Sequence, residues 1–161
     1  KQNLFMKLKL LYTFALLFTI SIFSATAQSS KKQPLKLVKY KENVKAPLSS
    51  QELSFIKEVY SDKFDAYVSN NPQKLKDLKN LLRNRVIIKE MPELVGNTEK
   101  YKTLAEVGLF NTYNSALTFD TTYNKSTFNV LKYNLEYFGR GSRVYRIANT
   151  NFFIVILSQH Q

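Results

Sequence analysis

The chain has 161 residues, with 12 Phe and 10 Tyr but no cysteine, and its 24 Lys and Arg against 12 Asp and Glu give a formal net charge of +12. The lack of cysteine excludes disulfides, thiolate metal sites and cysteine redox chemistry. The low content of Gly and Pro excludes a collagen-like or low-complexity chain. We therefore expect a globular protein that is stabilised by packing and whose positive field attracts anions.

The first 27 residues predict a secretory signal peptide. A basic start at 6–9 precedes an apolar run over 10–23, which is shorter than the roughly 18 to 20 residues that cross a bilayer core. Ala25 and Ala27 supply the small side chains of a cleavage site. Cleavage there makes Gln28 the first residue of the mature protein.

An uncleaved N-terminal anchor is the alternative interpretation, because lysines also follow the apolar run. Residues 1–5 precede a candidate start at Met6 and do not look like part of the signal. With cleavage, we expect no membrane span in the mature chain and an exported location, periplasmic or secreted.

Residues 28–46 are rich in lysine and lack a consistent apolar face, which predicts a basic flexible arm. The remaining residues, 47–161, are numerous enough for a single domain with its own core. Near their start, Ser49 and Glu52 have the spacing of a capping box, and an apolar stripe behind them predicts a helix over 49–69.

A second helix is expected to begin at Asn71, where an N-cap is followed by Pro72 in the first helical position. Its leucines share one face. On the opposite side, Lys76, Lys79 and Arg83 recur at helical spacing and predict a basic stripe.

The C-terminal forty residues are strand-like. Apolar residues alternate over 131–137, a second strand is expected over 143–148, and 152–157 is continuously apolar, as in a central or doubly covered strand. These segments predict an antiparallel three-stranded meander, with a strand over 86–91 at its edge. The expected fold class is α+β, with two N-terminal helices packed on a small, mainly antiparallel sheet. Residues 92–127 give no clear pattern.

No catalytic, metal or cofactor motif is present, and we predict none of these sites. His160 is the sole histidine and lies next to the end of the sequence. Glu58 and Asp62 are one turn apart but are interleaved with lysines, which indicates a solvated face. Because acids distant in sequence can meet after folding, a converging carboxylate pair stays open as an alternative.

Basic residues are the candidate binding feature. An anion-binding surface would draw on the second helix and on the C-terminal hairpin, where Tyr145 could stack on sugars or bases; the residues concerned are Lys76, Lys79, Arg83, Arg140, Arg143 and Arg146. Solubility explains the same charges equally well.

Three short motifs resemble a group of small exported bacterial proteins of unknown function: Asn71-Pro72-Gln73, Leu81-Leu82-Arg83-Asn84-Arg85-Val86 and the closing Ser158-Gln159-His160-Gln161. The resemblance extends from Ser49 to the end of the sequence and implies no activity and no functional residues.

The sequence therefore predicts an exported, non-catalytic binding or interaction protein of the bacterial cell envelope. Its expected partner is an envelope protein or an anionic envelope component, and nucleic acid is a poor candidate. One alternative is an electrostatic binder of anionic polymer or lipid, namely polysaccharide, lipid headgroups or nucleic acid. The other is a hydrolase with an unrecognised carboxylate site.

Overall fold

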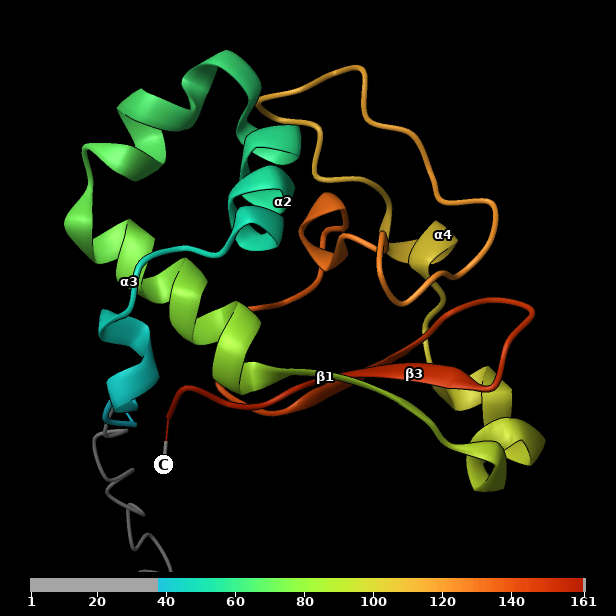
Figure 1. The fold of residues 1–161 in the computed structure, drawn as a ribbon. Helices are drawn as coiled ribbons and strands as arrows, with labels where there is room; N and C mark the ends of the chain where they lie inside the picture. The colour runs from blue at the N-terminus through green and yellow to red at the C-terminus, as the bar shows by residue number, and fades with distance from the viewer. Residues whose placement is uncertain (1–37, 161) are drawn as a thin grey trace, which may run out of the picture. The chain divides into compact units, whose positions relative to one another are not determined.

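The computed structural model describes residues 38–160, so the predicted signal peptide, its cleavage site and residues 28–37 of the predicted arm lie outside the described residues. The described part mixes helix and sheet (Figure 1). In chain order, its α-helices and strands are α2 (Ser50–Tyr60), α3 (Pro72–Asn80), β1 (Val86–Glu90), α4 (Leu104–Val107), β2 (Arg143–Arg146) and β3 (Phe152–Ile156). Within this part, none of the helices is long and apolar enough to cross a membrane.

Helix α2 begins as predicted and ends earlier. The Ser49 side chain accepts a hydrogen bond from the Glu52 backbone, and the Glu52 carboxylate accepts one from the Ser49 N–H, which completes the capping box. The helix ends at Tyr60 because Ser61 adopts a φ of 48° and a ψ of −128°, a backbone conformation that glycine prefers. The prediction of one helix over 49–69 is therefore wrong. Short 3-10 and π-helical turns, Ser61–Lys63 and Asp65–Ser69, replace its second half.

Helix α3 begins where the sequence predicted. The Asn71 side chain accepts a hydrogen bond from the Lys74 backbone N–H at 3.0 Å, and Pro72 occupies the first helical position. A π-helical turn, Leu81–Arg85, continues the helix and leads directly into β1.

The sheet has three antiparallel strands in the order β1-β3-β2. Figure 1 shows β1 beside β3. Val86 pairs with Ile156 on one side of β3, and Arg143 pairs with the same residue on the other. The central position of β3 confirms the prediction made from its continuous apolar run. The predicted C-terminal meander is wrong, because β1 supplies the third strand and residues 131–137 do not join the sheet.

Residues 133–137 alternate in burial, but the segment 131–137 does not form a strand. Val130–Lys132 is a 3-10 turn, and after it the N–H groups of Leu135 and Tyr137 donate to carbonyl oxygens two residues earlier, at 2.8 and 2.7 Å. Backbone groups used in this way are not available for a strand ladder. Lys132 does not follow the alternation, because it is only 5% exposed.

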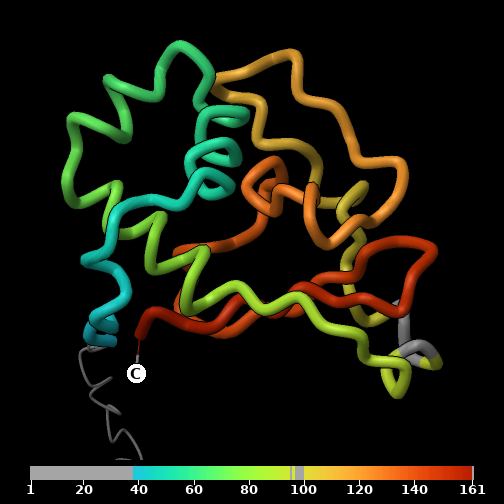
Figure 2. The backbone as a smooth tube through the Cα atoms, in the orientation of Figure 1, coloured from blue at the N-terminus to red at the C-terminus, as the bar shows by residue number. Residues whose placement is uncertain are grey.

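The predicted flexible arm is corrected for residues 38–46, which lie against the domain (Figure 2). Their 3-10 turn, Glu42–Lys45, contacts α3 and buries Val44 to 4% exposure. The Val38 N–H donates to the carbonyl of Gln159 at 2.8 Å, and the Tyr40 hydroxyl donates to Asp77. Lysine density gave no sign of these contacts, because they join residues far apart in the sequence.

One hydrophobic cluster unites α2, α3, the sheet and the irregular segment 104–135. The helices contribute Ile56, Val59, Tyr60, Leu78 and Leu81, while the irregular segment contributes Leu104, Leu117, Phe128, Val130, Leu131, Tyr133 and Leu135. The segment that the sequence left unassigned is therefore partly core.

We predict that Ser61→Gly stabilises the protein by about 1 kcal/mol, because glycine relieves the strain of a positive φ. The matched control Ser54→Gly, at an exposed position inside α2, should destabilise it by about 0.5 kcal/mol through lost helix propensity. Urea unfolding measures both changes. A loss of stability in Ser61→Gly would contradict the backbone assignment.

Candidate functional site

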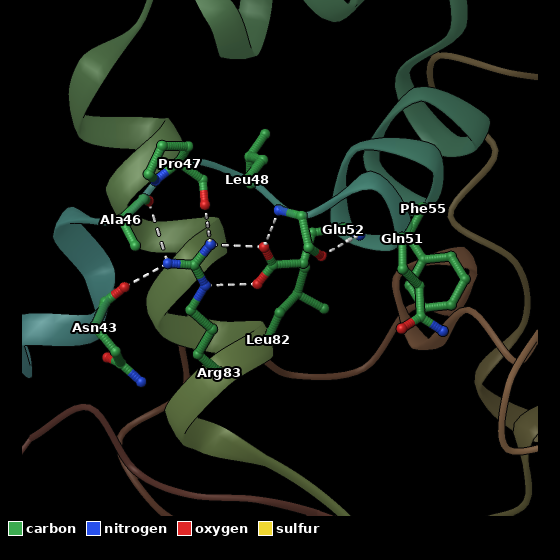
Figure 3. Close-up of a pocket in the computed structure, with 10 residues that line it drawn as sticks. Asn43, Ala46, Pro47, Leu48, Gln51, Glu52, Phe55, Leu82 and Arg83 are labelled. Atoms are coloured by element: carbon green, nitrogen blue, oxygen red, sulfur yellow. Dashed lines mark hydrogen bonds and ion pairs between the residues drawn. The ribbon is translucent and has the colours of Figure 1, made fainter.

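Arg83 joins the N-terminal segment to α2 (Figure 3). Its Nε and one terminal nitrogen donate to the two carboxylate oxygens of Glu52, both at 2.6 Å, in a bidentate ion pair whose side chains are about 15% exposed. Its other contacts go to the carbonyl oxygens of Asn43, Ala46 and Pro47. These five contacts match the five N–H donors of an arginine, so Arg83 has no donor left for an external anion.

The basic stripe predicted on α3 is therefore not a surface feature. Lys79 is 7% exposed, and its ammonium donates to the carbonyl of Ala46 at 3.0 Å. Lys76 is the exposed member of the three. Because the 42–47 segment folds back over this side of the helix, Lys79 and Arg83 bind backbone of the same chain.

The hairpin arginines do not converge either. Arg143 pairs with Glu136 at 2.8 Å on the surface, and Arg146 is half-buried. An odd separation along β2 places these two side chains on opposite faces of the sheet. Arg140 is exposed in the turn before β2. Most of the predicted anion-binding residues are thus engaged or separated within the fold.

An open groove of about 560 Å³ lies beside Arg83 (Figure 3). Pro47, Leu48, Phe55 and Leu82 contribute to its lining. Since the Arg83 donors at its edge are all occupied within the chain, Arg83 is not available there to bind an anion.

A polar network around the buried Lys132 links the irregular segment to α2. The Lys132 ammonium lies 2.8 Å from a carboxylate oxygen of Asp120 and 3.8 Å from one of Glu58. Tyr133 donates its hydroxyl to the other oxygen of Asp120 at 2.6 Å, and Asn129 donates to Glu58 at 2.8 Å. Burial and the bond to Asp120 raise the pKa of Tyr133 well above its usual value, so the phenol stays a neutral donor.

Two carboxylates therefore converge, as the sequence left open, but they converge on a lysine. Glu58 takes part in this network, whereas Asp62 pairs with Lys63 on the surface at 2.7 Å. Both acids are exposed, as the predicted solvated face requires, but Glu58 also takes part in the Lys132 network. Among residues 38–160, no group of three or more His, Asp and Glu side chains is arranged to hold a metal ion.

An apolar cavity of about 340 Å³ lies between the helices and the segment 131–138. Helix α2 lines it with Val59 and Tyr60, α3 with Leu78, and the π-helical turn after α3 with Leu81. The segment lines it with Leu131, Tyr133, Leu135 and Tyr137, and Phe110 completes the apolar lining. Most of these side chains belong to the hydrophobic core, so core side chains form most of the cavity wall.

Cationic groups flank one end of the apolar cavity. The Lys74 ammonium lies 5.4 Å from the centre of the Phe138 ring, and the Arg85 guanidinium lies 6.0 Å from the same centre. Phe138 is 45% exposed, which places it at the mouth, whereas Arg85 is 5% exposed. Arg85 donates to the carbonyls of Leu157 and Tyr137, and burial lowers its pKa from the ordinary value.

Neither this cavity nor the place of Lys74 at its mouth was predicted from the sequence. The available signal was local: Lys74 precedes Leu78 by four residues and so shares its helix face. The opposite wall gave no usable signal, because its residues were predicted to be a strand in the sheet.

Comparison with family models, with curated protein sequences and with solved structures found no match to this chain. The fold, the buried charges and the cavities are therefore the features that bear on function.

We predict that Arg83→Ala lowers the free energy of unfolding by about 3 kcal/mol, because it leaves Glu52 and the backbone carbonyls without their donor. Arg140→Ala removes the same charge from an exposed turn and should change stability by less than about 0.5 kcal/mol. Chemical denaturation compares the two variants. Equal effects would show that Arg83 does not hold the N-terminal segment.

Acid should weaken the same contact. The Arg83 hydrogen bond holds the pKa of Glu52 below its ordinary value of 4.5. The pair therefore contributes fully above that ordinary value and loses its contribution as pH falls through the lower, folded-state value. We expect the stability difference between the parent protein and Glu52→Gln to shrink from about pH 6 to about pH 3. A difference independent of pH would contradict this assignment.

Proposed function

We propose that this protein is a non-catalytic binding protein and that the apolar cavity is its ligand site. The observation that carries the proposal is the cavity itself. Its volume of about 340 Å³ falls within the range of roughly 300 to 1,000 Å³ found for small-molecule sites. Close-packed interiors leave few voids larger than a water molecule. A cavity of this size, lined by core side chains, is therefore better suited to holding a ligand than to stabilising the empty fold.

We propose a non-catalytic role because the acidic groups near the sites described above are held in ion pairs and hydrogen bonds. Glu52 is paired with Arg83, and Asp120 is shared by Lys132 and Tyr133. Tyr133 lines the cavity, but its hydroxyl donates to Asp120. A carboxylate held in this way is a poor general base toward a ligand.

Export to the cell envelope is part of the same proposal. It is supported by the basic start, the apolar run over 10–23 and the small residues before Gln28. An envelope compartment is rich in lipids and their breakdown products, which match an apolar cavity in chemistry.

A second candidate function, binding of a partner protein, is favoured by an apolar row across the sheet. Ile87 pairs with Val155, which pairs with Val144, so the three side chains share one face. Ile87 is 42% exposed. If this row binds a partner, Ile87→Lys should abolish the association and leave ligand binding in the cavity unchanged.

We predict that 1-octanol binds the parent protein and that Leu78→Trp weakens this binding at least about tenfold, because the indole fills the cavity. Isothermal titration calorimetry measures the affinity. Leu157→Trp, the same change at a residue that is 37% exposed at the end of β3, is the matched control and should bind as the parent does.

Leu135→Phe is a milder second variant at another lining position, for use if the larger change impairs folding. No binding of 1-octanol to the parent protein, or equal binding by all variants, would contradict the cavity as a ligand site.

A further inference from the structure

We infer that the ligand of the apolar cavity is a single-chain amphiphile with a carboxylate head, and that Lys74 binds this head. The inference rests on the proposed function and deepens it by naming the ligand class. Three observations carry it: the charges around the mouth, the position of the nearest acids and the volume available to the chain.

Lys74 is the one charged side chain in the lining of the cavity, as far as the described residues go. Its ammonium stands over Phe138 at the mouth, 5.4 Å from the ring centre. Leu78 lies one turn further along α3 and Leu81 beyond it, so the helix presents a cation first and apolar side chains deeper in.

Arg85 adds a second positive charge behind the mouth. Its guanidinium lies 6.0 Å from the centre of the Phe138 ring. It also donates to the carbonyl of Tyr137, which lines the cavity. Within residues 38–160 this arginine forms no salt bridge. Carbonyl oxygens accept its hydrogen bonds, and the Asp77 carboxylate acts on it without forming a salt bridge. A cation without a direct anionic partner still favours an anion nearby, and the attraction is stronger where water is excluded.

The nearest acids do not cancel this field inside the cavity. Asp77, one turn after Lys74, lies outside the lining and accepts hydrogen bonds from Tyr40 and Gln73. Glu136 is paired with Arg143 at 2.8 Å. The mouth therefore has a positive charge without an acid in the wall, which is the complement of an anionic head.

The volume of the cavity limits the length of the hydrocarbon chain of the ligand. A protein cavity of about 150 Å³ holds benzene, so about 340 Å³ holds on the order of a dozen non-hydrogen atoms at the same density. A carboxylate with a chain of about eight to ten carbons fits this limit, whereas a two-chain lipid exceeds it. With the head at Lys74, the chain runs between Leu78, Leu81 and Leu135.

The test compares octanoate with 1-octanol, which have the same chain and differ in charge. We expect both to bind the parent protein in isothermal titration calorimetry. Lys74→Met keeps an unbranched apolar stem and removes the charge, so it should weaken octanoate about tenfold, the usual scale for losing a charge-assisted hydrogen bond. It should change the affinity for 1-octanol by less than about twofold.

Two further variants complete the design. Lys76→Met removes an exposed charge from the same helix and should leave both affinities unchanged, which separates location from net charge. Lys74→Arg keeps the charge and should retain octanoate binding within about threefold.

The outcomes separate the two proposals. If 1-octanol binds the parent protein but Lys74→Met leaves octanoate unaffected, or weakens both ligands equally, the assignment of the head group is overturned and the ligand site stands. If 1-octanol binds the parent protein but octanoate does not, the assignment of a carboxylate head is likewise overturned. If neither ligand binds, the proposed function itself fails, and this inference fails with it.

Discussion

The burial of the Lys132 ammonium is the constraint on which the irregular half of the domain depends. An ammonium withdrawn from water costs several kcal/mol unless it is paired. Asp120 and Glu58 provide that pairing, at 2.8 and 3.8 Å, from the loop and from α2. Because Tyr133 also donates to Asp120, one network fixes the turn at 130–132 against the helix. The wall of the apolar cavity continues directly from this turn.

A second cation, Arg83, has a similar role for the N-terminal segment. Arg83 binds Glu52 and the backbone of residues 43–47, and Lys79 adds a bond to Ala46. Part of the large positive charge of the chain thus stabilises segments that lack regular secondary structure. Lys74, at the mouth of the cavity, differs because it faces a space that a ligand can occupy.

The features that could be predicted from the sequence are those fixed by neighbouring residues. Both helix caps, at Ser49 and Asn71, close over three residues, and the apolar run of β3 needs no partner to be recognised. The end of α2 was missed because Ser61 takes a conformation for which glycine is the usual signal. A period of two in 131–137 predicted a strand of the sheet. Instead, Leu135 and Tyr137 donate within the segment, and an isolated antiparallel bridge joins Tyr133 to Leu109.

The candidate site could not be predicted because its geometry arises between distant segments. Lys79 and Arg83 face away from the leucines of α3, and whether that side meets solvent is decided by the fold of residues 42–47. The cavity likewise requires α2, α3 and the segment 131–138 to meet without filling the space between them. Composition and periodicity describe each segment separately and carry no information on such a gap.

The most direct test of the account is to locate octanoate on the protein by intermolecular nuclear Overhauser effects. We expect the terminal methyl group to contact the side chains of Leu81 and Leu135, and the methylene next to the carboxylate to contact Lys74. Contacts confined to the exposed face of the sheet at Ile87 and Val155, or to the groove beside Arg83, would contradict a ligand site in the apolar cavity.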